Sequence, residues 1–335
     1  MCLFLYYILN ILYIIMSIYL HNPSHNGDQF ITLGIVRKII EQNTDKKFVI
    51  VPACSMYLFS ELLNDNVALQ MPPVVWDENK SIHLDENIIS KYHNTLWNTE
   101  GGNIYINIWK VLIEYNYYCI SLVNRVNFIK KLLEDIKRKT GVDIFFNCDN
   151  YKELIPMLPS INIENLSKIS KVVNCNNHNQ SMPLLSNINI ENIKTKLLSY
   201  KKKIIFFYNQ NSCSGIENSH PKNINEHVVS ELIQRYGNEY IILLTKQCNT
   251  TNKNVLFIEN EFNICPRLDG LNLVINAYIA DLCDKIYFKN NGGSLFILNQ
   301  MNTHNSSNRQ YVFIGSRAHY NVINEYGLKC QLLEV

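Results

Sequence analysis

One carboxylate near the start of the chain has a setting that suits proton transfer. Asp28 follows Ser24-His25-Asn26-Gly27 and stands just before apolar residues that recur at helical spacing. Gly27 permits a tight turn with positive φ, and a carboxylate at a helix start beyond a strand can take a proton from a hydroxyl group as general base. The alternative is structural, because aspartate is also a favoured N-cap residue.

A glycine-rich turn late in the chain has the composition of an anion-binding turn. It lies between an apolar run and a short helical segment, where free backbone amides suit a diphosphate. It lacks both the Gly-Lys-Ser/Thr of a P-loop and the G-x-G-x-x-G spacing, so a plain β-to-α turn is the alternative. The residues we expect to bind the diphosphate of a donor substrate there are Asn290, Asn291, Gly292, Gly293 and Ser294.

A third polar segment follows an apolar run in the middle of the chain. Its amides and hydroxyl groups could bind the same donor, and a lysine further along it could meet the donor phosphate. Asparagine is abundant throughout this chain, so a solvent loop is the alternative interpretation. The expected donor-binding residues here are Asn209, Gln210, Asn211, Ser212 and Lys222.

The elements that must position these motifs repeat a strand–helix pattern in the first half. Short apolar runs predict strands at 17–21 and 48–51, with a helix over 30–40 between them. We expect an irregular segment over 76–105, including a Glu100-Gly101-Gly102 loop, then a helical region over 106–138 and a strand at 142–146.

The strand–helix pattern restarts in the second half, after a polar stretch without periodicity around residues 174–200. A tail helix and an edge strand are expected beyond residue 317. The predicted helices cover 223–236, 268–282 and 295–298, and the predicted strands cover 203–208, 240–244, 255–258, 285–288 and 311–314.

Two successive strand–helix halves predict an α/β fold with two Rossmann-like domains facing a cleft. As in a two-domain transferase that binds its two substrates on separate halves, we expect an apolar leader over residues 1–16, an acceptor domain over 17–185 and a donor domain over 186–335. Ligands of such sheets bind beyond the carboxyl ends of the strands, which is where all three motifs stand. The loop residues His25, Asn26 and Gly27 would then face the acceptor.

Three stretches resemble the heptosyltransferase-like family of GT-B glycosyltransferases. They are HNGDQFITLGIVRKI, KKIIFFYNQNS and LDGLNLVINAYIADLCDKIYFKNNGGSLF. Gly27-Asp28 falls on the family's Gly-Asp pair, which implies that Asp28 is the general base. On the family's Asn-Asp-Ser-Gly-Pro donor turn, Asn290 and Gly293 match, whereas Asn291, Gly292 and Ser294 are replacements.

The resemblance implies a metal-independent transfer of a sugar from a nucleotide-sugar donor to an acceptor hydroxyl, with no further cofactor. The acceptor would be a glycan or a lipid-linked or protein group. The family's Lys-x-Trp-Pro signature is missing, and Phe296 stands where the family usually has a histidine after the donor turn. The resemblance therefore does not imply heptose as the sugar or ADP as the nucleotide. A sugar-nucleotide epimerase of the same fold and a non-catalytic sugar- or nucleotide-binding protein remain alternatives.

Composition excludes several other classes of protein. A hydrophobic content of 47% excludes a disordered chain, and a net charge of +2 argues against a nucleic-acid partner. Ten scattered cysteines without metal-site spacing indicate reduced, mostly buried thiols, as in the cytoplasm. The apolar residues 1–20 are either a dispensable leader before a strand, with Met16 as an alternative start, or a membrane anchor.

Overall fold

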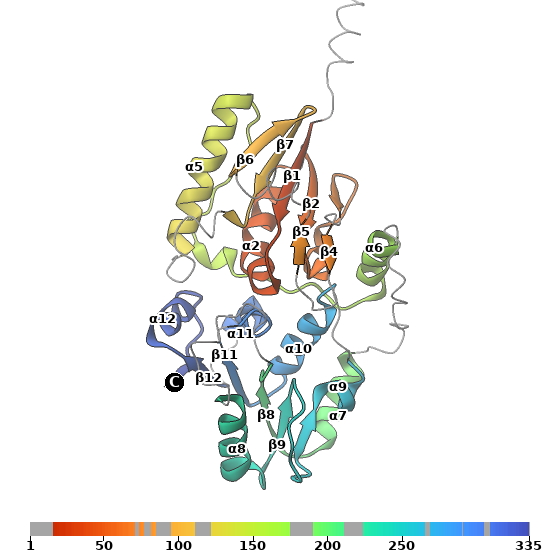
Figure 1. Cartoon of the computed structure of the whole chain (residues 1–335), viewed down its shortest axis with the longest axis vertical. Helices are drawn as coiled ribbons and strands as arrows, with labels where there is room; N and C mark the ends of the chain where they lie inside the picture. Colours follow the sequence, from red (N-terminus) through yellow and green to blue (C-terminus); the bar gives the residue numbers. More distant parts are fainter. Residues whose placement is uncertain are drawn as a thin grey trace, which may run out of the picture.

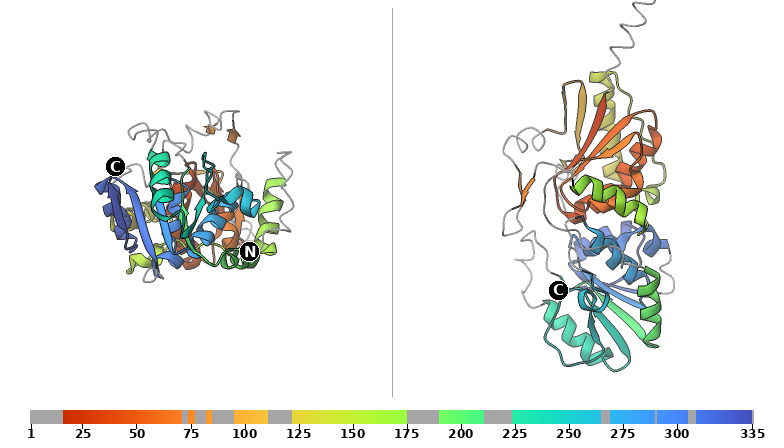
Figure 2. Two further views of the ribbon diagram at one scale, coloured as in Figure 1. Left: turned by 90° about the horizontal axis from the view of Figure 1, so that it is seen from below. Right: turned by 90° about the vertical axis from the view of Figure 1, so that its right-hand side faces the viewer.

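The computed structural model has two α/β halves stacked along the long axis of the molecule (Figures 1 and 2). It describes residues 16–70, 74–76, 82–84, 95–110, 122–174, 190–210, 224–264, 269–289, 291–304 and 309–334. The expected leader and the expected domain boundary at 185/186 lie outside these residues. Among the described helices, none has both the length and the hydropathy needed to cross a bilayer.

The first half is built on a five-stranded sheet of order β3-β2-β1-β7-β6. Four of its strands run parallel, and only β6 runs antiparallel to its neighbour β7. The strands are β1 (Ser17–Asn22), β2 (Lys47–Pro52), β3 (Val67–Leu69), β6 (Trp97–Glu100) and β7 (Asn103–Asn107), with the small pair β4 (Val74–Trp76) and β5 (Ile82–Leu84) apart from them. The helical segments are α2 (Asn26–Gln42), η1 (Met56–Leu62), α5 (Leu122–Thr140), η3 (Tyr151–Leu154) and α6 (Ile163–Asn174).

The second half is built on a six-stranded, fully parallel sheet of order β10-β9-β8-β11-β12-β13. Numbered within this half, the order is 3-2-1-4-5-6, which is the Rossmann arrangement. The strands are β8 (Lys203–Phe207), β9 (Tyr240–Leu244), β10 (Val255–Phe257), β11 (Lys285–Lys289), β12 (Gln310–Gly315) and β13 (Gln331–Glu334). The helical segments are α7 (Ile190–Ser199), α8 (Ile224–Tyr236), α9 (Ile258–Phe262), α10 (Leu271–Asp281), η6 (Ser294–Leu298), α11 (Gln300–His304) and α12 (Arg317–Glu325).

This topology confirms the predicted α/β class with two largely parallel sheets, and the tail forms the expected helix and edge strand. Two expectations in the first half are wrong. Residues 103–107, expected to be partly irregular and partly helical, form strand β7. The Glu100-Gly101-Gly102 segment is a tight hairpin turn between β6 and β7, with φ of +56° at Gly101 and +80° at Gly102. Two positive φ angles in succession favour glycine at both positions.

The predicted strand at 142–146 is also wrong, because this segment pairs with side chains instead of a strand. The Asn43 amide donates to the Phe145 carbonyl at 2.7 Å and its oxygen accepts the Phe145 N–H at 2.9 Å. Gln42 makes the same two-point contact with the backbone of Asn147, at 2.8 Å for both bonds. The segment is therefore extended and half-buried like a strand, but two amides at the end of α2 replace the ladder.

Asn43→Ala is expected to destabilise the protein by about 2 kcal/mol, because it leaves the backbone of Phe145 unpaired where Asn43 itself is buried. Gln42→Ala is the matched control: it removes the equivalent contact at an exposed site, where water replaces the amide, and should cost well under about 1 kcal/mol. Urea unfolding of both variants measures the difference. Equal losses would contradict a special role for Asn43.

The two halves share one hydrophobic core, which places their facing edges in direct contact. Phe30 of α2 stacks on Phe296 of η6 with ring centroids 4.9 Å apart, and both side chains are fully buried. Gln300 adds two hydrogen bonds to the first half, to the carbonyls of Pro156 at 2.9 Å and Ile155 at 3.0 Å. In Figure 1, α10 and α11 lie between the two sheets.

Candidate functional site

The site is located by the points where the strand order reverses in each sheet. In the first sheet this point lies between β1 and β7, and in the second between β8 and β11. Ligands of open α/β sheets bind beyond the carboxyl ends of the strands at such points. The loop after β1 and the turn after β11 meet here: a Cβ added to Gly27 would lie 2.8 Å from the Cα of Gly292. Two sequence-predicted motifs from opposite ends of the chain are thus neighbours.

Gly27 has a different role from the one expected. It lies in the first turn of α2 without a positive φ, so the expectation of a left-handed turn is wrong. What requires glycine is the close approach of the second half, because a Cβ would also lie 3.0 Å from a side-chain carbon of Leu295. Any side chain at residue 27 would push the two halves apart.

Asp28 is a buried residue in the first turn of α2, with an exposed fraction of 3%. It is not the N-cap, which is His25. Its carboxylate oxygen Oδ2 accepts a hydrogen bond from the hydroxyl group of Ser24, which itself precedes the helix. The Asp28 carbonyl accepts from the Thr32 hydroxyl at 2.8 Å. The carboxylate is therefore held in a defined orientation at the edge where the two halves meet.

The other residues of the expected acceptor loop lie around this carboxylate in different ways. His25 is exposed, whereas the Asn26 side chain accepts a hydrogen bond from the Ser55 hydroxyl, beyond the end of β2. Ser55 is fully buried with a φ of +53°, which is uncommon for a non-glycine residue. It packs on Gly270 of the second half, where a Cβ would lie 2.7 Å from the Ser55 Cα.

In the expected donor turn, several backbone amides already donate hydrogen bonds to other groups of the turn. Asn291 is buried, and its side-chain oxygen accepts the Ser294 N–H at 2.9 Å, so it caps the turn. The Leu295 N–H donates to the Asn291 carbonyl at 3.1 Å, and the Ser294 hydroxyl donates to the Lys289 carbonyl. The turn is thus held by its own residues, and an anion would be bound by the partly exposed backbone of Gly292 and Gly293.

Gly293 lies beneath the ring of Tyr208, which follows β8. A Cβ on Gly293 would lie 1.7 Å from the phenol oxygen of Tyr208 and 2.3 Å from its Cζ. The φ of Gly293 is −77°, so no left-handed conformation requires glycine at this position. Glycine is needed because Tyr208, itself buried, occupies the space above it.

The described part of the third motif links β8 to β9. The buried Asn209 side chain donates to the Lys246 carbonyl at 2.8 Å and accepts the Lys246 N–H at 2.7 Å. Gln210 reaches the donor turn, because its carbonyl accepts from the Asn291 amide at 3.0 Å. The remaining candidates, Asn211, Ser212, Lys222 and Asn290, lie outside the described residues.

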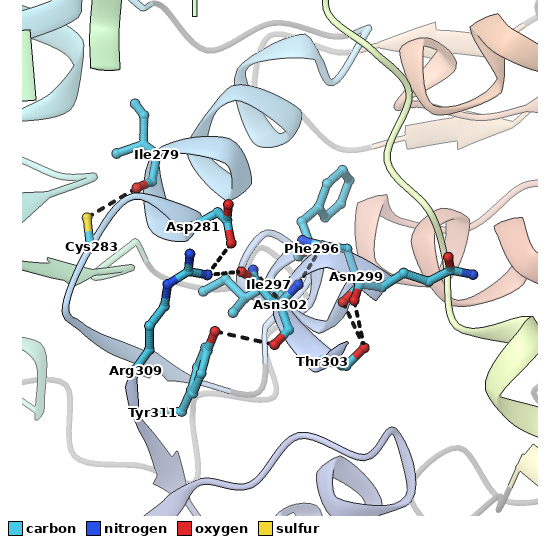
Figure 3. Close-up of polar contacts among 11 residues, drawn as sticks. Ile279, Asp281, Cys283, Phe296, Ile297, Asn299, Asn302, Thr303, Arg309 and Tyr311 are labelled. Atoms are coloured by element: carbon cyan, nitrogen blue, oxygen red, sulfur yellow. Dashed lines mark hydrogen bonds and ion pairs between the residues drawn. The ribbon is translucent and has the colours of Figure 1, made fainter. Parts of the chain in front are cut away.

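A polar network behind the donor turn fixes its position (Figure 3). The fully buried Asn302 side chain donates a hydrogen bond to the Ile297 carbonyl at 3.0 Å and accepts one from the Arg309 guanidinium at 3.5 Å. Arg309 also forms an ion pair with Asp281. Asn299 donates to the Phe296 carbonyl at 2.8 Å. These contacts connect η6 and α11 to α10 and β12, so the turn that precedes η6 has a rigid support.

A cysteine next to Asp28 remains a neutral thiol. Burial is the main cause that raises the pKa of Cys54 to about 12, and the nearby charge of Asp28 contributes to that rise. The Cys54 thiol donates to the Ser24 carbonyl at 3.5 Å. All five cysteines that the structure describes are free, and no three His, Cys, Asp or Glu side chains among the described residues are placed to hold a metal ion.

Sequence reasoning missed three residues that shape this site. Ser24 orients Asp28, Ser55 holds Asn26, and Tyr208 covers Gly293. Ser24 lies in the loop four residues before Asp28, and this short spacing is a signal that sequence reasoning could have used. Ser55 and Tyr208 act across long sequence separations, and nothing in the local sequence indicates their contacts.

No protein-family model and no curated protein sequence matches this chain. Among solved structures, it is similar to a glycosyl transferase family 9 protein from Veillonella parvula DSM 2008, with 11% identity over 96% of this chain and 86% of that one and a TM-score of 0.40. It is also similar to E. coli ADP-heptose lps heptosyltransferase II, with 13% identity over 94% of this chain and 90% of that one and a TM-score of 0.40. A third similar structure is E. coli heptosyltransferase WaaC with ADP, with 10% identity over 96% of this chain and 91% of that one and a TM-score of 0.38.

The names of these three proteins agree with the family that the sequence motifs resemble. Because every TM-score is below 0.5, we infer the activity and the site residues from this chain's own geometry.

Proposed function

We propose that this chain is a glycosyltransferase that moves a sugar from a nucleotide-sugar donor to an acceptor hydroxyl without a metal ion. The observation that carries the proposal is the contact between Gly27 and Gly292. This contact brings together, in one site, the points at which the strand order reverses in the two α/β sheets. The carboxylate of Asp28 lies on one side of the site and a glycine turn on the other. A site built from two such edges suits a reaction between two ligands, one on each half.

In the proposed reaction, the donor lies at the carboxyl edge of the second sheet. The Gly292–Gly293 backbone faces its diphosphate, which leaves with the bonding electrons of the anomeric C–O bond. Asp28 accepts the proton of the acceptor hydroxyl as that oxygen attacks the anomeric carbon. Ser24 keeps the carboxylate oriented. Because Asp28 is 3% exposed and Gly292 lies against Gly27, the acceptor would need these two turns to separate.

The burial of Asp28 also favours a second candidate, a non-catalytic protein that binds a sugar or nucleotide and keeps the fold. In that case the carboxylate would serve only to fix the loop before α2 through Ser24. The two candidates differ in whether a bound donor is consumed.

A panel of nucleotide sugars tests the proposal, read first as an increase in melting temperature. A donor present at 100 times its Kd stabilises the folded state by about 2.7 kcal/mol, which is readily detected. We expect one nucleotide sugar to stabilise the protein more than its free nucleoside does, and to release nucleoside diphosphate when acceptor glycans are added. Stabilisation without release under any acceptor would favour the binding protein, and no stabilisation by any nucleotide sugar would contradict both.

A further inference from the structure

A fully buried glutamine follows the proposed general base. Gln29 lies directly after Asp28 in the first turn of α2, and its exposed fraction is 0%. Its side chain points back past the start of the helix, as long helical side chains generally do. The amide nitrogen Nε2 donates to the carbonyls of Asn22 at 2.7 Å and Ser24 at 3.0 Å. The glutamine therefore joins the first turn of α2 to the loop that precedes it.

The other end of this carboxamide lowers the stability of the fold. Oε1 of Gln29 is buried and has no hydrogen-bond partner among the described residues. An unpaired buried oxygen costs free energy, because it has lost its hydrogen bonds to water. Rotating the carboxamide would not remove this cost, since it would turn the oxygen toward two carbonyl oxygens. A methionine of similar length would fill the same space, so packing alone does not require glutamine at residue 29.

The two carbonyls that Gln29 contacts each have a second donor. The Asn22 carbonyl also accepts the Ala53 N–H at 2.9 Å, and the Ser24 carbonyl also accepts the Cys54 thiol at 3.5 Å. Without Gln29, neither carbonyl would be left unpaired in the interior. The amide of Gln29 therefore fixes where these carbonyls lie and is not needed to satisfy them.

The residue that these contacts hold in place is Ser24. The Asn22 side-chain oxygen accepts its N–H at 3.1 Å, while Gln29 donates to its carbonyl at 3.0 Å. The Ser24 hydroxyl in turn donates to Oδ2 of Asp28. Because Asp28 and Gln29 are consecutive residues of one helix, their two bonds with Ser24 close a small ring of contacts. A change at Gln29 would therefore move the hydroxyl that orients the carboxylate.

We propose that Gln29 is a positioning residue that fixes Ser24 and, through it, the carboxylate of Asp28, an inference that rests on the proposed role of Asp28 as general base. Being fully buried, Gln29 acts on Ser24 and not on a substrate. Its amide holds the carboxylate in one orientation before the acceptor binds. A catalytic group that is displaced by about 1 Å can lose about 10²-fold in rate, so a fixed loop is a large advantage at this position.

The test compares Gln29→Met with a matched control, Asn43→Ala. Asn43 is a buried amide at the other end of α2, whose bonds to Phe145 support the fold far from the carboxylate. The measurements are turnover, KM for both substrates, urea unfolding, and hydrogen exchange of the Ser24 amide. We expect Gln29→Met to lower turnover about tenfold with KM and the urea midpoint unchanged, and to speed exchange at Ser24 about tenfold. Asn43→Ala should do the reverse, with a lower urea midpoint and unchanged turnover.

A double variant shows whether Gln29 acts through Ser24. In the Ser24→Ala background, Gln29→Met should lower turnover by less than about twofold, because the hydroxyl that it positions is already absent. A further tenfold loss in that background overturns the inference. So does a Gln29→Met protein that loses stability as Asn43→Ala does, or one in which turnover and exchange are both unchanged. Gln29→Leu provides the same comparison if the methionine variant does not fold.

Hydrogen exchange separates this inference from the proposed function, because it needs no substrate. If the unmodified protein transfers no sugar, the glycosyltransferase proposal fails. Faster exchange at Ser24 in Gln29→Met, with the urea midpoint unchanged, would still support the positioning of Ser24 and Asp28 by Gln29. Unchanged exchange in an active protein would overturn the inference and leave the proposed function standing.

Discussion

Asp28→Asn is expected to lower turnover by about 10²- to 10⁴-fold while the protein keeps its fold and its affinity for the donor. Asparagine has nearly the shape of aspartate, and its side-chain oxygen can still accept the hydrogen bond from Ser24. It cannot accept a proton from the acceptor hydroxyl. The measurement is the initial rate of sugar transfer, together with the donor-induced increase in melting temperature.

Ser24→Ala is the control that separates proton transfer from positioning. It keeps the carboxylate and removes only the hydroxyl group that donates to Asp28. If Asp28 is the general base, this variant should retain much more activity than Asp28→Asn. A fully active Asp28→Asn protein would contradict the proposed mechanism, whereas the fold would be unaffected. A variant that binds donor normally but transfers no sugar would support it.

The elements of the second half were predictable because buried parallel strands appear as continuous apolar runs. Ile204–Phe207 and Ile241–Leu244 are each flanked by polar residues, and their burial on both faces leaves no alternation to misinterpret. The first half was harder. The edge strand β6 contains asparagine, threonine and glutamate, and such residues give only a weak strand signal.

The segment at 142–146 shows why pattern alone can mislead. Ile144 and Phe146 are buried and alternate with exposed residues, which is the pattern of a half-buried strand. The pattern correctly indicates an extended chain against a core, but it cannot show what satisfies the backbone. Here Asn43 and Gln42 supply those hydrogen bonds. In a chain so rich in asparagine, the sequence offered no reason to single out these two amides.

The site could be predicted in part, because Rossmann-type halves place their ligand edges by topology. That rule alone predicts that Asp28 and the glycine turn lie at the same cleft. It could not show that Gly27 and Gly292 touch, or that Tyr208 lies over Gly293. The first contact depends on how the two halves pack, and the second depends on how two neighbouring strands of one sheet end. Single glycines carry no local sign of a distant ring or backbone.

Gly293→Val is expected to destabilise the protein by about 3 kcal/mol or more, because overpacking of a filled space forces neighbours out of position. A Cβ at this residue would lie within 2.3 Å of the Tyr208 ring carbon Cζ, and Tyr208 is itself buried. Donor binding should weaken as well, since the displaced ring and the new side chain both stand over the turn. Urea unfolding and donor titration measure the two effects.

A double-mutant cycle identifies Tyr208 as the cause. Tyr208→Ala alone should cost several kcal/mol through the loss of a large buried ring. In that background the space above Gly293 is open, so the added cost of Gly293→Val should fall by at least ~1 kcal/mol, as expected for residues in contact. Gly292→Ala is the matched control, because its Cβ would lie closest to the Gly27 amide nitrogen, at 3.1 Å, and its three nearest atoms belong to Gly27 and Asn26. Tyr208→Ala should therefore not rescue it. If the losses in free energy of unfolding for Tyr208→Ala and Gly293→Val were strictly additive, the ring would not occupy the space above the turn. The requirement for glycine at residue 293 would then have to come from the ligand.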